Sequence, residues 1–188
     1  MKEKKNQFEV WAQFKVAPKS VKDIHDFFIK EHNIHPDFLI NNLHLTVYHS
    51  RRPMPDVVEM SKPCSFTLDT IESRFMVLAP GGENPRPELV PGRRKVGIRI
   101  KKSSEFMNVI MAFRKEFFLF ETEEVLGKRK PSSKVRNAFG SRHFQPHITI
   151  LKSGSGIQTN LTEVGDDFRD FVHEIKFDKV IVQKKRNF

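Results

Sequence analysis

Several runs of the chain alternate apolar and polar residues, and this two-residue period predicts strands. Residues 8–17, FEVWAQFKVA, are apolar at every second position, with Trp11 on the opposite, polar face. The runs RKVGIRIK and KFDKVIVQ show the same period at 94–101 and 176–183. Residues 64–80, CSFTLDTIESRFMVLAP, favour a hairpin or two short strands.

Three other segments have the spacing of amphipathic helices. Residues 18–33 begin with Pro18 and Ser20, and Asp23 follows the serine by three positions, as in a capping box. Residues 103–120 start with serines that can cap a helix. Residues 161–175 are expected to be helical in part. In the second segment one helical stripe is apolar and consists of Phe106, Val109, Ile110, Phe113 and Phe117.

The order of these elements suggests a weak internal duplication. Each half of the chain has a strand and a helix followed by a further strand, and that further strand carries a histidine, His44 in the first half and His147 in the second. A length of 188 residues suits one domain, so we expect a single α+β domain over 1–188. Its two halves would face each other across a cleft, with a basic loop at about 121–142.

Composition narrows the class of protein. A hydrophobic content of 38% with 18 phenylalanines is enough to pack a globular core. The longest apolar runs, such as FFLF and FMVLA, are too short to cross a bilayer, and the N-terminus does not read as a secretory signal. A single cysteine, Cys64, cannot form an internal disulfide. These features predict a cytoplasmic protein that does not use a membrane or an obligate protein partner.

The chain is basic, and its charge is clustered. Lys and Arg number 33 against 23 Asp and Glu, which gives a net charge of +10 and favours anionic partners such as nucleotides, RNA or DNA. Residues 93–104 and 127–143 each carry six Lys or Arg and no acid. Each cluster is either a phosphate-facing patch or an ordinary solvated segment.

A short motif occurs twice, in NNLHLTVYHS at 41–50 and in FQPHITILKS at 144–153. In a strand, residues two apart point the same way, so His44 shares a face with Thr46, and His147 with Thr149. The apolar neighbours then face the core; they are Leu43, Leu45 and Val47 in the first strand and Ile148 and Ile150 in the second.

Two imidazoles and two hydroxyls suit phosphodiester chemistry. A neutral imidazole takes a proton from an attacking water or hydroxyl, and an imidazolium returns one to the leaving oxygen. Threonine hydroxyls donate hydrogen bonds to the non-bridging oxygens of the phosphate. Metal binding is the competing interpretation, but neither motif includes an acidic residue or a cysteine, so we expect no metal and no cofactor.

Other residues near the motifs are candidates for substrate binding. Tyr48 is in phase with Thr46 in a straight strand and would offer its ring to a base, unless it merely closes the strand. Trp11 would line the groove or pack under a loop. Arg142 and His143 precede the second motif and can reach a phosphate. His49 falls on the opposite face if the strand runs straight.

The motif stretches NLHLTV and PHITIL resemble the two-histidine (2H) phosphoesterase superfamily, which includes LigT-like RNA 2′,3′-cyclic phosphodiesterases. The resemblance implies a bilobal α+β fold, in which two pseudo-symmetric lobes have antiparallel sheets that line a central groove and helices outside. It implies that His44 and His147 are the catalytic pair and that Thr46 and Thr149 hold the phosphate. Lys152 falls where LigT-like members often carry a basic residue.

The expected activity is that of a metal-independent phosphodiesterase, with RNA or a nucleotide as substrate. The first choice is the opening of a 2′,3′-cyclic phosphate to a 2′-phosphate. A second version of the same chemistry acts on cyclic di- or oligonucleotide signals or on 2′-5′ linked oligonucleotides. A rival from another class is a non-catalytic module that binds RNA or a nucleotide.

Overall fold

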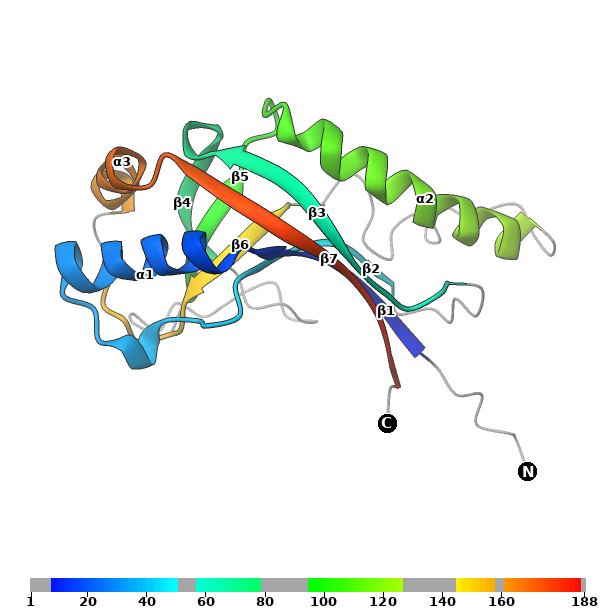
Figure 1. Cartoon of the computed structure of the whole chain (residues 1–188), viewed down its shortest axis with the longest axis horizontal. Coiled ribbons are helices and arrows are strands. Elements are labelled where there is room, and N and C mark those ends of the chain that lie inside the picture. The colour runs from blue at the N-terminus through cyan, green and yellow to red at the C-terminus, as the bar shows by residue number, and fades with distance from the viewer. Residues whose placement is uncertain (1–7, 51–56, 79–94, 127–144, 158–160, 187–188) are drawn as a thin grey trace.

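The computed structural model describes residues 8–50, 57–78, 95–126, 145–157 and 161–186. They form an α+β structure with one seven-stranded sheet, in the order β3-β7-β1-β2-β6-β5-β4, and every pair of neighbouring strands is antiparallel (Figure 1). The predicted α+β class and antiparallel pairing are confirmed. The strands are β1 (Phe8–Val16), β2 (His44–Ser50), β3 (Met60–Asp69), β4 (Ser73–Leu78), β5 (Lys95–Ile100), β6 (His147–Leu151) and β7 (Glu174–Arg186).

The helices α1 (Pro18–His32), α2 (Phe106–Leu126) and α3 (Leu161–Phe171) pack against one face of the sheet. Phe14, Leu45, Ile148, Ile98 and Phe75 are successive cross-strand partners from β1 to β4, so their side chains share a face. Aromatic rings of α2 contact Phe14, and rings of α1 and α3 contact Phe75. We call this the helix face; within the described residues, these helices leave the opposite face of the sheet uncovered.

Phe14 is the centre of the core on the helix face. Its side chain is fully buried, and its ring lies 4.9 Å from that of Phe66 on β3, 5.3 Å from Phe113 on α2 and 6.1 Å from Phe177 on β7. Aromatic pairs of this kind contribute about 0.5–1.5 kcal/mol each beyond the burial of their area. The cluster therefore packs α2 against β1, β3 and β7.

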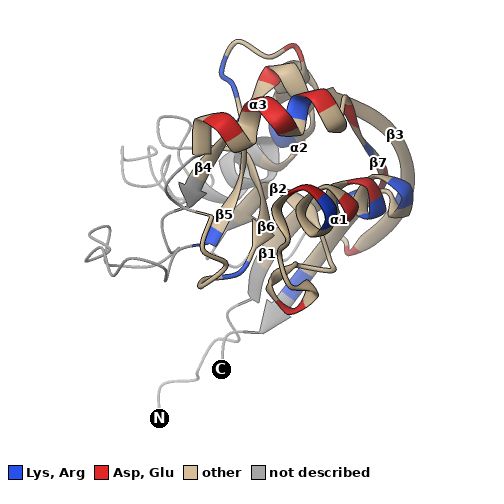
Figure 2. Ribbon diagram, turned by 90° about the vertical axis from the view of Figure 1, so that its left-hand side faces the viewer, with Lys and Arg blue, Asp and Glu red and all other residues tan. Residues whose placement is uncertain are grey.

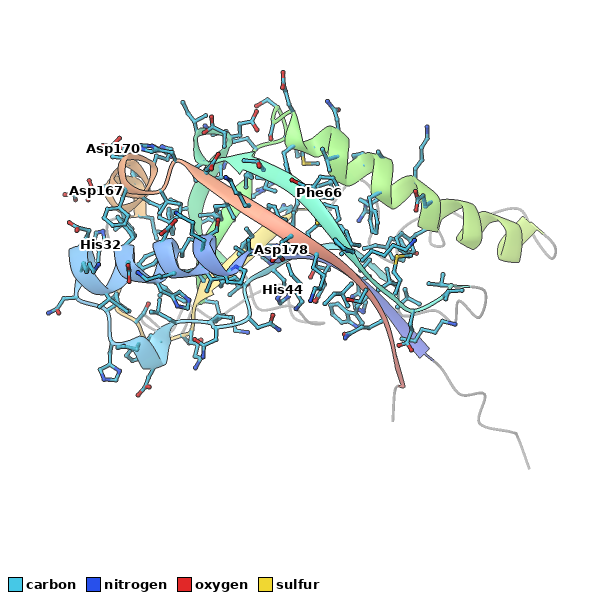
Figure 3. The ribbon with its side chains drawn as sticks, in the orientation of Figure 1. His32, His44, Phe66, Asp167, Asp170 and Asp178 are labelled. Atoms are coloured by element: carbon cyan, nitrogen blue, oxygen red, sulfur yellow. The ribbon has the colours of Figure 1, made fainter. Side chains whose placement is uncertain are left out.

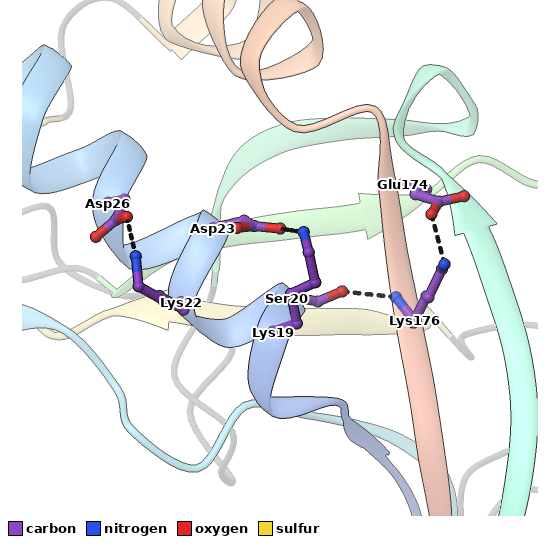
Figure 4. A network of polar contacts seen from close by, with 7 residues as sticks. All are labelled: Lys19, Ser20, Lys22, Asp23, Asp26, Glu174 and Lys176. Atoms are coloured by element: carbon purple, nitrogen blue, oxygen red, sulfur yellow. Dashed lines mark hydrogen bonds and ion pairs between the residues drawn. The ribbon is translucent and has the colours of Figure 1, made fainter.

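Helix α1 begins differently from its prediction. Pro18 occupies the first turn, but the N-cap is Ala17, which makes no side-chain cap hydrogen bond. Ser20 is buried inside the helix, and its hydroxyl accepts a hydrogen bond from the backbone N–H of Lys176 at 3.0 Å (Figure 4). The capping-box interpretation is wrong because this hydroxyl ties α1 to β7. Asp23 forms an exposed ion pair with Lys19.

Of the two alternatives predicted for residues 64–80, the structure has two separate strands and not a hairpin: β3 and β4 lie at opposite edges of the sheet, and the 3-10 helix η2 (Thr70–Glu72) connects them. Thr70 holds this crossing because its buried hydroxyl donates to the carbonyl oxygen of Val172 at 2.6 Å. The expected loop at 121–142 begins later than predicted, since α2 continues to Leu126.

The described part of the chain has no helix long and apolar enough to cross a membrane. Pairing of β2 with β6 joins the two halves of the chain into the single sheet. The two halves thus share one sheet, and the expected division of the fold into two lobes stays a prediction.

Candidate active site

The two motif strands are neighbours at the centre of the sheet. Leu45 of β2 is the cross-strand partner of Ile148 of β6. Each of these residues directly follows a motif histidine, so extension of the register sets His44 opposite Thr149 and Thr46 opposite His147. The two histidines are then diagonal neighbours, roughly 7–8 Å apart between backbones. The fold thus brings the four predicted residues together on one face, which we call the motif face.

The two imidazoles are oriented in the same way. His44 Nδ1 lies 2.8 Å from the carbonyl oxygen of Asn42, and His147 Nδ1 lies 2.8 Å from the carbonyl oxygen of Gln145. A carbonyl oxygen can only accept, so Nδ1 carries the proton in both rings. Nε2 is therefore the atom through which each ring takes up or gives up a proton.

A β-bulge follows each motif threonine. In β2 the partners change from Gln13↔Thr46 to Ala12↔Tyr48, and in β6 from Gly97↔Thr149 to Val96↔Leu151. One residue is skipped in each case, and the two residues after each threonine are both buried. They are Val47 and Tyr48 in β2 and Ile150 and Leu151 in β6.

Both bulge carbonyls have hydrogen-bond donors. The fully buried Arg114 of α2 donates from Nη1 to the carbonyl oxygen of Val47 at 2.6 Å. The backbone N–H of Ile40 donates to the carbonyl oxygen of Ile150 at 2.9 Å. A buried carbonyl without a donor would cost about 1–3 kcal/mol, so these two contacts stabilise the bulges.

The bulge in β2 changes the face on which Tyr48 lies. Tyr48 is 2% exposed, and its ring stacks on that of Phe117 of α2 with centroids 4.7 Å apart. Arg114 lies over the same ring, at 5.9 Å. The prediction that Tyr48 shares a face with Thr46 is wrong, and its ring cannot stack on a substrate base.

The same bulge returns His49 to the motif face, where a straight strand would not place it. His49 is the cross-strand partner of Trp11, and the two rings stack with centroids 3.5 Å apart. His49 is 5% exposed while Trp11 is half-buried. Trp11 therefore lies on the predicted face and covers the imidazole of His49.

Each motif histidine has a cationic neighbour on the next strand outward. Lys15 of β1 is the partner of His44, and Arg99 of β5 is the partner of His147. Lys15 Nζ also donates to Asn42 Oδ1 at 2.8 Å, which links the cation to the residue that orients His44. Positive charge thus flanks the motif residues on both sides, an arrangement that would favour a phosphate.

The structure does not place the other substrate-binding candidates beside the motif histidines. Lys152, five residues after His147, is exposed, and its ammonium donates to the carbonyl oxygen of Asp37 at 2.9 Å. Arg142 and His143 lie outside the described residues, as does the basic segment 127–143. Part of the other basic cluster is described and includes Arg99 on the motif face.

Negative charge gathers elsewhere on the molecule. Figure 2 shows acidic residues on α3 and both acidic and basic residues on α1. His32 Nε2 of α1 and Asp167 Oδ2 of α3 lie 4.0 Å apart at one end of the sheet. His44 lies near the middle of the sheet (Figure 3). A pocket of 710 Å³ has an acidic lining that includes Asp69, Glu72, Glu105 and Glu174. This acidic lining disfavours an anionic ligand in that pocket.

The described residues contain no group of three or more His, Cys, Asp or Glu side chains that could hold a metal ion.

No protein-family model matches the chain, and no curated protein matches its sequence. The sequence pattern did not identify His49 or Arg114 as part of this region, whereas Lys15 shares the predicted polar face of Trp11 and Arg99 belongs to the predicted basic cluster 93–104. One signal was present: each threonine is followed by two apolar residues, which breaks the alternation that a straight strand would show.

Proposed function

We propose that the protein is a metal-independent phosphodiesterase of the 2H phosphoesterase type, with His44 and His147 as general acid and base. The observation that carries this proposal is the matched pair of imidazoles, each oriented by an Nδ1–H bond to a backbone carbonyl, on adjacent strands. The register makes the two histidines diagonal neighbours on one face of the sheet, which suits proton transfer on both sides of one phosphate.

In the proposed reaction, water attacks the phosphorus of a 2′,3′-cyclic phosphate. One histidine takes a proton from the water while the other gives a proton to the leaving 3′ oxygen, so the product is a 2′-phosphate. Thr46 and Thr149 donate hydrogen bonds to the non-bridging oxygens. Lys15 and Arg99 add positive charge where negative charge grows in the transition state.

The substrate is proposed to be RNA with a cyclic phosphate end. Cyclic di- or oligonucleotides and 2′-5′ linked oligonucleotides are alternative substrates for the same residues. A module that only binds RNA or a nucleotide is the alternative from another class. The paired, identically oriented imidazoles favour the enzyme, because binding alone does not need two proton-transfer groups at one phosphate.

The test is turnover of a panel of these substrates in excess EDTA by the wild type, His44→Ala and His147→Ala. We expect each variant to lose about 10²- to 10⁴-fold in kcat/KM. His173→Ala is the control, because His173 is an exposed histidine outside the motif strands. Phosphorus NMR of the product identifies the bond that is broken.

Two results would contradict the proposal. Turnover that EDTA abolishes would show that a metal ion is needed. Activity that survives in both alanine variants would remove the histidines from the mechanism. Thermal unfolding of each variant, measured by circular dichroism, separates a chemical loss from a loss of fold.

A further inference from the structure

Two arginines lie side by side at the β4 edge of the motif face. Arg74 of β4 is the cross-strand partner of Arg99 of β5, which is in turn the partner of His147. Cross-strand partners share a face, so both guanidinium groups belong to the same face as the motif residues. Arg74 is exposed and Arg99 is half-buried.

Like charges directly opposite each other destabilise a sheet. In the described part of the chain, no Asp or Glu lies within ion-pair distance of either guanidinium. The unfavourable pairing is relieved when the two groups share one anion. Guanidinium groups are well suited to a phosphate, because their planar forks donate two parallel hydrogen bonds.

The position of the pair separates it from the reacting phosphate. Neighbouring strands are roughly 5 Å apart, so β5 and β4 lie about 5 and 10 Å beyond the strand of His147. Arg99 is close enough to serve the reacting phosphate as well, whereas Arg74 is one strand further out. A phosphate bound between Arg74 and Arg99 would therefore lie beside the reacting phosphate. The separation suits two neighbouring phosphates of one ligand.

We propose that Arg74 and Arg99 form a second phosphate subsite, which selects a substrate with a further phosphate beside the reacting one. The inference rests on the proposed function for the identity of the reacting phosphate. It deepens that function by naming the substrate class: an oligonucleotide, and not a single nucleoside 2′,3′-cyclic phosphate. The discriminating residue is Arg74.

The first measurement compares kcat/KM on a short RNA with a cyclic phosphate end and on a nucleoside 2′,3′-cyclic phosphate. In Arg74→Gln the ratio of the two values falls about 10- to 100-fold, because a hydrogen bond between charged groups is lost. Lys62→Gln is the matched control: it removes the same charge from an exposed lysine whose partner, Val180, lies on the helix face. The control leaves the ratio unchanged.

The second measurement does not depend on turnover. Binding of a fluorescein-labelled short RNA to His44→Ala is followed by anisotropy at several salt concentrations, with and without Arg74→Gln. Loss of one phosphate contact lowers the slope of log affinity against log salt by about 0.7 for a single strand. Lys62→Gln in the same background leaves the slope unchanged.

The outcomes separate the two proposals. An unchanged ratio together with an unchanged slope in Arg74→Gln overturns the subsite. Absence of turnover by the wild type on every phosphodiester contradicts the proposed function. A lowered salt slope for Arg74→Gln in the anisotropy measurement would still support the subsite in that case. Arg74 is exposed, so the variant is expected to fold, and its thermal unfolding is measured alongside.

Discussion

Leu45 and Ile148 are cross-strand partners, and each is the residue immediately after a motif histidine. This register relates the two halves of the site by an approximate twofold rotation between β2 and β6. The repeat extends to the surroundings: both imidazoles bond through Nδ1 to the carbonyl two residues before, and both strands bulge after the threonine. The two halves of the site therefore match in the orientation of the rings and in the bulges as well as in the motif residues.

The proposed acid–base pair predicts a bell-shaped dependence of kcat/KM on pH. Activity rises as the base loses its proton and falls as the acid loses its own. His44→Gln and His147→Gln should each abolish a different limb of the curve, and the limb lost identifies the role of that ring. A wild-type profile that is flat from about pH 5 to 9 would contradict paired proton transfer.

The motif threonines are predicted to act through their hydroxyls. Thr46→Val and Thr149→Val keep the β-branched shape of the side chain and remove the donor. Each should lower kcat/KM about 10²-fold, by comparison with loss of one oxyanion donor elsewhere. Thr→Ser at the same positions retains the hydroxyl and should retain most activity. Equal losses in the valine and serine variants would point to packing as the role of the threonines.

Trp11 and Tyr48 should behave differently because the bulge places them on opposite faces. If Trp11 stacks on a substrate base, Trp11→Leu weakens binding by about 1–3 kcal/mol, measured as an increase in KM or Kd. Tyr48→Phe keeps the ring against Phe117 and should leave KM unchanged. A raised KM in Tyr48→Phe would contradict the placement of this side chain.

Arg114 is predicted to hold the bulge that sets His49 against Trp11. Arg114→Met leaves the carbonyl of Val47 without its donor and should lower the free energy of unfolding by about 1–3 kcal/mol in urea denaturation. The exposed neighbouring position supplies a matched control, Lys115→Met.

The fluorescence of Trp11 provides a local readout of the same change. The chain has one tryptophan, so its emission reports on the stacked pair alone. We expect the emission to change in Arg114→Met and to stay constant in Lys115→Met. Unchanged stability and unchanged emission in Arg114→Met would show that the bulge does not need this arginine.

Much of the secondary structure could be predicted because it depends on local periodicity. The alternation in β1 and the apolar stripe of α2 both reflect which side of each element is buried. The ends of elements were harder to predict, since distant partners decide them. Ser20 has the sequence features of a cap, yet its hydroxyl bonds to Lys176 on β7. Residues 64–80 were compatible with a hairpin or with two separate strands, and only the tertiary structure shows that the two strands join opposite edges of the sheet.

The four motif residues could be predicted from two short patterns, because a strand places residues two apart on one face wherever it lies. Strand order and bulges are different: they depend on hydrogen bonds between segments far apart in sequence, here Leu45 with Ile148 and Arg114 with Val47. The bulge in β2 puts Tyr48 in the core and sets His49 against Trp11. The pairing of β5 with β6 sets Arg99 beside His147. The local pattern is enough to name the proposed reactive groups, and the long-range hydrogen bonds determine what surrounds them.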